Sequence, residues 1–202
     1  MIGNLPLFTG RMDSAPSCPT NPTLVPATRH RDARGWFAES WSIDAYARIG
    51  IGCAFVQDNH SLSRAAFTLR GLHYQRPPHT QAKLVRCLRG RIFDVAVDLR
   101  AGSPGFGRWT GVELSAEGGA AFFVPIGFAH GFLTLEPDCE VFYKVSAPYA
   151  PASDAGLLWD DPAIGIDWPL PRGVAPVLSA KDAALPRLAD IAQPFPSQEG
   201  TD

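Results

Sequence analysis

Eight short segments with strand character follow one another between residues 54 and 147, and they constrain the fold more than any other feature. Each segment is bounded by Gly, Pro, Asn or Asp, the residues that favour turns. The segments read AFVQDNHSLS, TLRGLHYQ, AKLVRCLRG, RIFDVAVDLR, WTGVELSA, AAFFVPIG, HGFLTLE and CEVFYKVSA. Short strands at close spacing, together with 19 glycines and 19 prolines, predict an all-β sandwich or barrel.

The segment RIFDVAVDL alternates with the period of a strand. The alternation predicts an apolar face formed by Phe93, Val95, Val97 and Leu99. The opposite face is more polar and is formed by Asp94, Ala96 and Asp98. Gly90, in the stretch LRGR, indicates a hairpin connection to the preceding segment. A barrel of such strands can enclose a ligand, so inward-facing positions can be polar.

Helix signals are few. Ser42 is suited to be the N-cap and Gly50 the C-cap of one short helix, and a further helical turn can start at Ser179. Residues 1–22 and 191–202 lack periodicity and are rich in turn-forming residues, which predicts an N-terminal tail or arm and a C-terminal tail. Residues 23–190 are then expected to form a single domain.

Composition excludes several classes of protein. Hydrophobic residues make up 46% and charged residues 19%, which is enough for a core, and the net charge of -2 does not favour nucleic acid or an anionic membrane surface. No segment resembles a signal peptide or a membrane span, so a soluble, cytoplasmic protein is expected. The wide spacing of the four cysteines favours neither a zinc site nor a disulfide framework.

A polar cluster interrupts the strand pattern in RGLHYQRPPHTQAKLVRC. Strict alternation puts Arg70 and His73 on opposite faces, but a bulge at Gly71 would restore both to one face. Five cations favour an anionic partner such as a phosphate group, namely Arg70, Lys83, Arg86, Arg89 and Arg91. By default, His73 is a satisfied core or surface residue, Tyr143 a core aromatic, and Asp182 an acid in the first turn of a helix.

His130 follows Pro125 and Gly127 in the pattern Pro-x-Gly-x-x-His, which resembles half of a cupin metal site. The other half requires a His-x-His pair followed by Glu, whereas His73 is followed by Tyr74 and Gln75. His79 lies in a loop and is poorly placed as a rigid ligand. Because a metal site needs three or four convergent ligands, no metal is expected.

A series of longer motifs resembles the dTDP-4-dehydrorhamnose 3,5-epimerase family over residues 23–190. In chain order the motifs are RDARGWFAESW, FVQDNHS, RGLHYQ, QAKLVR, FDVAVDLR, GVELSA, VPIGFAHGFLTL, YKVS, WDDPAIGIDWPL and LSAKDAALP. The resemblance implies a cupin-like jelly-roll β-barrel with a few short helices, a homodimer, and no metal or organic cofactor. It also implies a thymidine-diphosphate-linked 4-keto-6-deoxyhexose as the substrate, with inversion at C3 and C5.

The resemblance also implies roles for individual residues. His73 matches the base, Asp182 its acidic partner, and Tyr143 the proton donor. Positions that contact the substrate are matched by Lys83, His130, Arg34, Glu39, Gln57, Asn59, Arg70 and Lys181, and Tyr149 matches the aromatic residue that stacks on thymine. Asp154 is the nearest match to a Glu that is usual in the family, and it is one methylene shorter.

The chemistry suits these residue types. A proton next to a ketone requires a base with a pKa near working pH, which a histidine provides, and a carboxylate on the other ring nitrogen fixes the tautomer. Strand geometry alone offers Asp94 or Asp98 for that carboxylate, whereas the resemblance selects Asp182. A lysine near O4 would stabilise the developing enolate charge.

Three alternative functions remain open from the sequence. An epimerase acting at C3 only or C5 only on a related dTDP-4-keto-deoxysugar would use the same residues. A metal-dependent cupin enzyme would bind a metal ion. A carbohydrate-binding jelly roll without activity would not need the combination of His73, Tyr143, Asp182 and Lys83.

Overall fold

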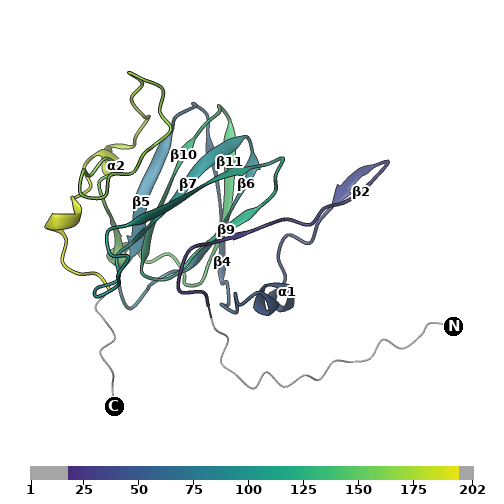
Figure 1. Cartoon of the computed structure of the whole chain (residues 1–202), viewed down its shortest axis with the longest axis horizontal. Coiled ribbons are helices and arrows are strands. Elements are labelled where there is room, and N and C mark those ends of the chain that lie inside the picture. The colour runs from purple at the N-terminus through teal and green to yellow at the C-terminus, as the bar shows by residue number, and fades with distance from the viewer. Residues whose placement is uncertain (1–17, 196–202) are drawn as a thin grey trace, which may run out of the picture.

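Two five-stranded antiparallel sheets face each other in the computed structural model, which describes residues 18–195 (Figure 1). In spatial order, the first sheet contains β1 (Thr23–Val25), β9 (Ala121–Val124), β6 (Lys83–Arg89), β11 (Cys139–Val145) and β4 (Gln57–Ser63). The second sheet contains β12 (Asp154–Gly156), β5 (Leu69–Gln75), β10 (Phe128–Thr134), β7 (Arg91–Asp98) and β8 (Trp109–Ser115). This arrangement confirms the expected all-β, cupin-like jelly roll.

The remaining elements are small and lie outside the two sheets. They are the hairpin of β2 (His30–Asp32) and β3 (Gly35–Phe37), the helices α1 (Ile43–Arg48) and α2 (Ala180–Ala183), and the 3-10 turns η1 (Pro151–Ser153) and η2 (Leu188–Asp190). The β2–β3 hairpin projects away from the sheets, whereas α2 and the C-terminal segment lie beside β5 (Figure 1). No helix within residues 18–195 has the length and apolar character of a membrane span.

Apolar side chains fill part of the space between the sheets and cover the outer face of the second sheet. Ala96 and Phe132 pack inward against the first sheet, whereas Val95 and Val97 pack outward against the C-terminal segment, including Trp168. The predicted alternation along β7 is therefore confirmed. It places Asp94, which has the same parity as Ala96, toward the interior.

Gly90 does not form a hairpin, so that prediction is wrong. β6 pairs with β9 and β11 in the first sheet, whereas β7 pairs with β10 and β8 in the second. With φ at +78°, Gly90 adopts a left-handed conformation that glycine tolerates, and it carries the chain from one sheet to the other. The connection is as short as a hairpin turn, but β6 and β7 form their hydrogen bonds with other strands and not with each other.

Both predicted helices form where their caps indicated. The Ser42 hydroxyl accepts a hydrogen bond from the Ala45 N–H at 3.2 Å, and the Ser179 hydroxyl accepts one from the Asp182 N–H at 3.0 Å. The C-cap of α1 is Ile49, one residue earlier than predicted, and Gly50 follows it with φ at +85°.

The described ends of the chain are attached to the domain. The Thr20 carbonyl accepts a hydrogen bond from Arg100 at 2.6 Å. At the other end, Phe195 is buried and its carbonyl accepts a hydrogen bond from the Ala101 N–H at 2.8 Å. The packed part of the chain therefore extends beyond residue 190. The rest of the predicted tails, residues 1–17 and 196–202, lies outside the described residues.

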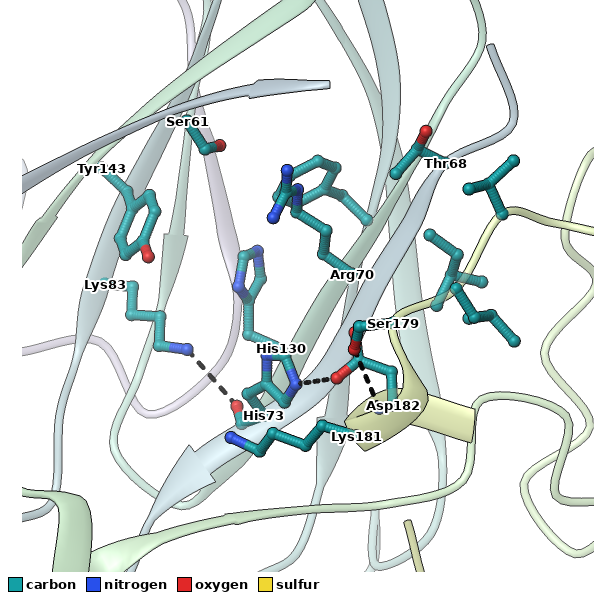
Figure 2. Close-up of a pocket in the computed structure, with 14 residues that line it drawn as sticks. Ser61, Thr68, Arg70, His73, Lys83, His130, Tyr143, Ser179, Lys181 and Asp182 are labelled. Atoms are coloured by element: carbon teal, nitrogen blue, oxygen red, sulfur yellow. Dashed lines mark hydrogen bonds and ion pairs between the residues drawn. The ribbon is translucent and has the colours of Figure 1, made fainter. Parts of the chain in front are cut away.

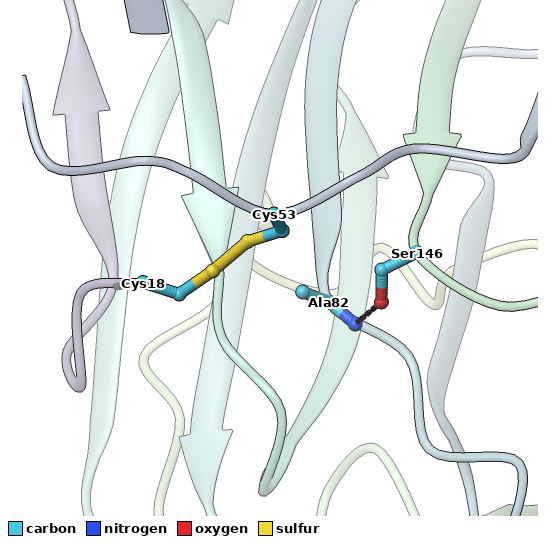
Figure 3. The surroundings of a disulfide bond; sticks show 4 residues. All are labelled: Cys18, Cys53, Ala82 and Ser146. Atoms are coloured by element: carbon cyan, nitrogen blue, oxygen red, sulfur yellow. Dashed lines mark hydrogen bonds between the residues drawn. A yellow bond between two sulfur atoms is a disulfide. The ribbon is translucent and has the colours of Figure 1, made fainter. Parts of the chain in front are cut away.

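Cys18 and Cys53 form a disulfide, which the wide cysteine spacing did not predict (Figure 3). The two residues are 35 positions apart in the sequence, yet their Cα atoms are 6.0 Å apart. The bond joins the segment before β1 to the loop before β4. Cys87 and Cys139 are free and buried. Sequence spacing gave no sign of the pair because the fold, and not the local chain, brings the two segments together.

We expect the variant Cys18→Ser to lower the free energy of unfolding by about 3–4 kcal/mol, because a cross-link closing a loop of this length restricts the unfolded chain. Urea unfolding of the oxidised protein and the variant measures the difference. Reduction of the wild type should produce the same shift, and it should leave the variant unchanged. An unfolding midpoint that does not respond to reduction would contradict this expectation.

Candidate active site

A polar pocket of about 430 Å³ opens between the two sheets (Figure 2). It is lined by side chains from five strands and from the segment that carries α2, among them Ser61, Arg70, His73, Lys83, His130, Phe132, Tyr143, Lys181 and Asp182. Seven of the residues to which the sequence assigned a catalytic or substrate-binding role therefore converge on one cavity. Its volume lies in the range typical of small-molecule sites.

A bulge in β5 brings Arg70 and His73 to the same side of the strand, as predicted. Against β10, His73 is opposite His130 and Arg70 is opposite Phe132, so two residues of β5 face one residue of β10. Gly71 makes the bulge possible, because its φ is +133° and a Cβ atom there would lie 2.6 Å from the Cα of Gly131. The sequence signal for the bulge was the glycine itself.

His73 is held by a carboxylate from a distant part of the chain. Its Nε2 lies 2.7 Å from Oδ1 of Asp182, and the Gly71 N–H donates to the other carboxylate oxygen at 3.3 Å. Burial alone would raise the pKa of Asp182, but its hydrogen bonds with His73, Gly71 and Ser179 outweigh burial and lower that pKa below its usual value. The carboxylate is thus positioned to orient the imidazole and to stabilise its charged form.

Lys83 is a buried cation beside the histidine. Its side chain projects from β6 across the pocket, and its Nζ donates to the His73 carbonyl at 3.3 Å. Burial lowers the pKa of Lys83 to about 8, and attraction to Asp94 and Asp154 opposes that effect. The ammonium group can therefore change charge near neutral pH.

His130 is paired with Asp94 in the interior, and neither residue is arranged as a metal ligand. Nε2 of His130 lies 2.5 Å from Oδ1 of Asp94, and both side chains are buried. Burial lowers the pKa of His130 despite the carboxylate. Within residues 18–195, no group of three or more His, Cys, Asp and Glu residues is close enough together to hold a metal ion. Asp94, one of the two carboxylates that strand geometry offered as a partner for His73, therefore pairs with His130 instead.

Tyr143 faces His73 across the pocket. It lies on β11 in the first sheet, whereas His73 lies on β5 in the second, and Figure 2 shows the tyrosine hydroxyl and the imidazole on different sides of the cavity. Burial raises the pKa of Tyr143, and Arg70 lowers it by a smaller amount, so the phenol retains its proton at neutral pH. A ligand between the sheets would have one of these groups on each face.

A second pocket of about 220 Å³ shares His73, Lys83, Tyr143 and Lys181 with the first. Gln57 donates to Asn59 at 2.9 Å and accepts from the Tyr149 N–H at 3.0 Å. The Tyr149 hydroxyl donates to Asp154 at 3.1 Å, and Lys181 forms an ion pair with the same carboxylate. The predicted binding residues Gln57, Asn59, Tyr149, Asp154 and Lys181 therefore form one connected wall.

Arg34 and Glu39 do not reach either pocket of this chain. Arg34 lies on the projecting hairpin and pairs with Asp32 at 2.5 Å, and Glu39 lies before α1, where it accepts from the Ser42 hydroxyl at 3.1 Å.

The five cations that the sequence suggested for an anionic partner do not all lie at the pocket. Arg70 and Lys83 line the pocket, whereas Arg89 and Arg91 pair with surface glutamates and Arg86 lies on the outer side of the first sheet.

Several further residues line the two pockets without a role assigned to them from the sequence. Ser61 lines the first pocket, and Gln75 and Gln81 line the second. Gln75 is a structural residue there, because its side-chain amide donates to the His79 and Pro148 carbonyls and accepts from the Ala150 N–H. Gln75 belongs to the polar stretch that interrupts the strand pattern, and its parity with His73 on β5 agrees with its position in the pocket wall.

These features define a cupin-like jelly roll with ionisable groups gathered in a pocket between its two sheets. The family model for dTDP-4-dehydrorhamnose 3,5-epimerase matches residues 20–190. The chain therefore belongs to the dTDP-4-dehydrorhamnose 3,5-epimerase family.

Individual relatives agree with this assignment. A dTDP-4-dehydrorhamnose 3,5-epimerase from Sinorhizobium fredii is 49% identical over 172 residues, which are 85% of this chain and 87% of the relative. A crystal structure of a dTDP-6-deoxy-D-glucose-3,5-epimerase from Legionella pneumophila, in complex with dTDP-4-keto-L-rhamnose, is 44% identical with a TM-score of 0.82. The match covers 89% of this chain and 94% of that chain. A crystal structure of a 3'-monoepimerase from Streptomyces bikiniensis, in complex with dTDP-quinovose, is 35% identical with a TM-score of 0.77. The match covers 86% of this chain and 87% of that chain.

Proposed function

We propose that the protein converts dTDP-4-dehydro-6-deoxy-D-glucose to dTDP-4-dehydro-L-rhamnose by inverting C3 and C5. Both carbons flank the 4-keto group, so a proton on either one can be removed to give an enolate and then replaced on the other face. The observation that carries this proposal is the placement of His73 and Tyr143 on opposite sheets around one pocket. Inversion requires a base and an acid on opposite faces of the same carbon.

His73 serves as the base in this proposal. It takes the proton from the carbon, and Asp182 stabilises the imidazolium that results. The 2.7 Å contact between the two side chains favours this role, because it fixes which ring nitrogen is directed toward the pocket.

The ammonium group of Lys83 stabilises the charge that develops on O4 of the enolate, an effect that is large because the lysine side chain is buried. Tyr143 then gives its phenolic proton to the opposite face of the carbon. Transfer of the imidazolium proton to solvent, and return of a proton to the phenolate, restore the starting charges before the second centre reacts.

The second pocket supplies the nucleotide site in this proposal. Tyr149 is 56% exposed and presents an aromatic face on which thymine can stack. Gln57 and Asn59 carry amide groups for the nucleoside, and Arg70, Lys181 and His130 provide donors for the phosphates and the sugar. Asp154 holds both Tyr149 and Lys181, so the shorter side chain at this position still organises the wall.

We further propose that the protein acts as a homodimer in which Arg34 and Glu39 reach the partner subunit's pocket. Neither residue lines the two pockets that hold the catalytic and nucleotide-binding candidates. The projecting hairpin exposes Trp36 and Phe37, which are 52% and 70% exposed, and a second copy would cover such apolar side chains.

Inversion at only one centre is the second candidate function, since it needs the same residues. A 3'-monoepimerase shares 35% of the aligned residues, compared with 49% for a 3,5-epimerase, which favours the double inversion.

Proton NMR of the 4-keto sugar nucleotide in deuterium oxide tests this function, because an enzyme that inverts both centres exchanges both protons. We expect the C3 and C5 signals to disappear with enzyme and the L-configured product to form, with the same rates in the presence of a chelator. Exchange at one carbon only would support the single-centre epimerase, and activity that needs one added divalent ion would support a metal-dependent cupin. Saturable binding without exchange would indicate a carbohydrate-binding protein.

A further inference from the structure

The β2–β3 hairpin has few attachments to the rest of the domain. Its two strands pair with each other and belong to neither five-stranded sheet, and the hairpin projects away from both sheets (Figure 1). Within the described part of the chain, the side chain of Arg29 makes the only hydrogen bonds that join residues 28–38 to the rest of the domain. Arg29 is therefore the polar anchor of the hairpin.

The guanidinium group of Arg29 lies in a niche between the hairpin and the turn that connects β8 to β9. It donates to the Ala116 carbonyl at 2.6 Å and also to the Glu117 carbonyl. Its Cζ lies 4.0 Å from the centre of the Trp36 ring, which is within the range of a cation–π contact. Gly119 leaves room for the group, because a Cβ atom there would lie 2.6 Å from Nη2 of Arg29. The contacts clamp the hairpin to the β8–β9 turn.

This clamp has a cost within the free subunit. The Nε atom of Arg29 is buried and finds no acceptor among the described residues. A buried donor without a partner destabilises the folded state. The hairpin contributes no strand to either sheet, so the clamp does not extend the ladders of the domain. A role outside the folding of the subunit would explain it.

The far end of the hairpin carries Arg34 in a fixed position. The backbone N–H of Arg34 donates to Oδ1 of Asp32 at 2.9 Å, and its Nε donates to Oδ2 at 3.0 Å. Asp32 is paired with Gly35 across the hairpin. A continuous set of contacts therefore runs from the β8–β9 turn through Arg29 and Trp36 to the guanidinium of Arg34.

We propose that Arg29 is a positioning residue that sets the direction in which the hairpin delivers Arg34 to the partner subunit's pocket. The inference rests on the proposed homodimer and extends it, because it names the contact that directs the hairpin. A hairpin that is held in the binding direction loses less conformational freedom when substrate binds. Loss of the clamp would therefore weaken substrate binding, whereas His73 and Tyr143 would keep their positions.

The variant Arg29→Met keeps an unbranched side chain but removes both hydrogen bonds. We expect KM for the 4-keto sugar nucleotide to rise about five- to tenfold and kcat to stay within about twofold of the wild type, because binding is weakened without a change at the reacting carbon. Arg64→Met is the matched control, since the Arg64 side chain is 84% exposed and its ion pair with Asp138 is 4.0 Å long. A fall in kcat with an unchanged KM in Arg29→Met would overturn the inference.

Hybrid dimers purified through two different affinity tags locate the effect. When one subunit carries His73→Ala and the other Arg29→Met, the working pocket belongs to the second subunit and receives a hairpin with an intact Arg29. We expect this hybrid to show the wild-type KM. When both substitutions lie on one subunit beside a wild-type partner, the working pocket receives the altered hairpin, and KM should be raised. The opposite pattern, or equal KM values in the two hybrids, would overturn the inference.

Sedimentation at the assay concentration separates the direction of the hairpin from dimer formation. Arg29→Met should remain a dimer, and a variant that dissociates would show that Arg29 holds the interface itself, which contradicts the inference. A monomeric wild type would overturn the inference together with the proposed homodimer. The proposed reaction would then still stand, because proton exchange is measured independently.

Calorimetric titration with dTDP gives a readout that needs no turnover. Arg29→Met should bind dTDP about five- to tenfold more weakly than the wild type, by the same loss of a directed Arg34. A wild type that exchanges no substrate proton would contradict the proposed reaction, whereas equal affinities for dTDP would overturn the role of Arg29. Should Arg29→Met fail to fold, Arg29→Gln carries the same test, because its shorter side chain cannot reach both carbonyl oxygens.

Discussion

The variant His73→Ala should lower kcat for epimerisation by about three to four orders of magnitude, since the proton next to the ketone would have no other positioned base. Substrate affinity should stay close to that of the wild type, because the nucleotide wall of the second pocket is unchanged. His73 is the only imidazole of the described chain that contacts Asp182. Proton exchange in deuterium oxide and steady-state kinetics measure the two effects separately.

Two other variants serve as comparisons for this result. Asp182→Asn should be less severe, because it removes the charge that stabilises the imidazolium but leaves the imidazole in place. His60→Ala should have little effect, because His60 is exposed on β4 and pairs with Glu140 outside the pocket. If His73→Ala retains activity within about tenfold of the wild type, a barrier difference of only ~1.4 kcal/mol, His73 is not the base.

The variant Tyr143→Phe should separate proton exchange from inversion. It keeps the ring and its packing but removes the phenolic proton. Since His73 and Tyr143 lie on opposite sheets, the enolate can still form, and His73 can return a proton to the face from which it came. In deuterium oxide we therefore expect the variant to exchange the C3 or C5 proton while inverting little, whereas the wild type exchanges and inverts together.

Tyr46→Phe is the matched control for this variant. Tyr46 is also buried, but its hydroxyl donates to the Ser40 carbonyl on the outer side of the first sheet. Its removal should change neither exchange nor inversion. If Tyr143→Phe inverts both centres at nearly the wild-type rate, the acid is another group. If exchange is lost as completely as inversion, the tyrosine is needed to form the enolate, and the division of roles between the two faces is wrong.

Local features of this protein were determined by the sequence alone. The alternation on β7 separated Val95 and Val97 from Ala96 and Asp94. Ser42 and Ser179 marked both helix starts, and Gly71 indicated the bulge that brings Arg70 and His73 to one side. Each of these features depends on the conformations and side chains of residues that are neighbours in the chain, so a short stretch contains the information.

Local patterns did not determine the pairings over long distances. The family resemblance, and not strand geometry, selected Asp182 as the partner of His73, 109 positions away. Only the tertiary structure paired Cys18 with Cys53 and placed Gly90 between two sheets, although it resembles a hairpin turn. Asp94 was a reasonable partner for His73 from parity alone, yet it holds His130. Strand pairing is selected by the burial of whole sheet faces, and many registers satisfy the same local pattern. The site therefore depends on which sheet faces pack together, and no single segment of the chain determines that packing.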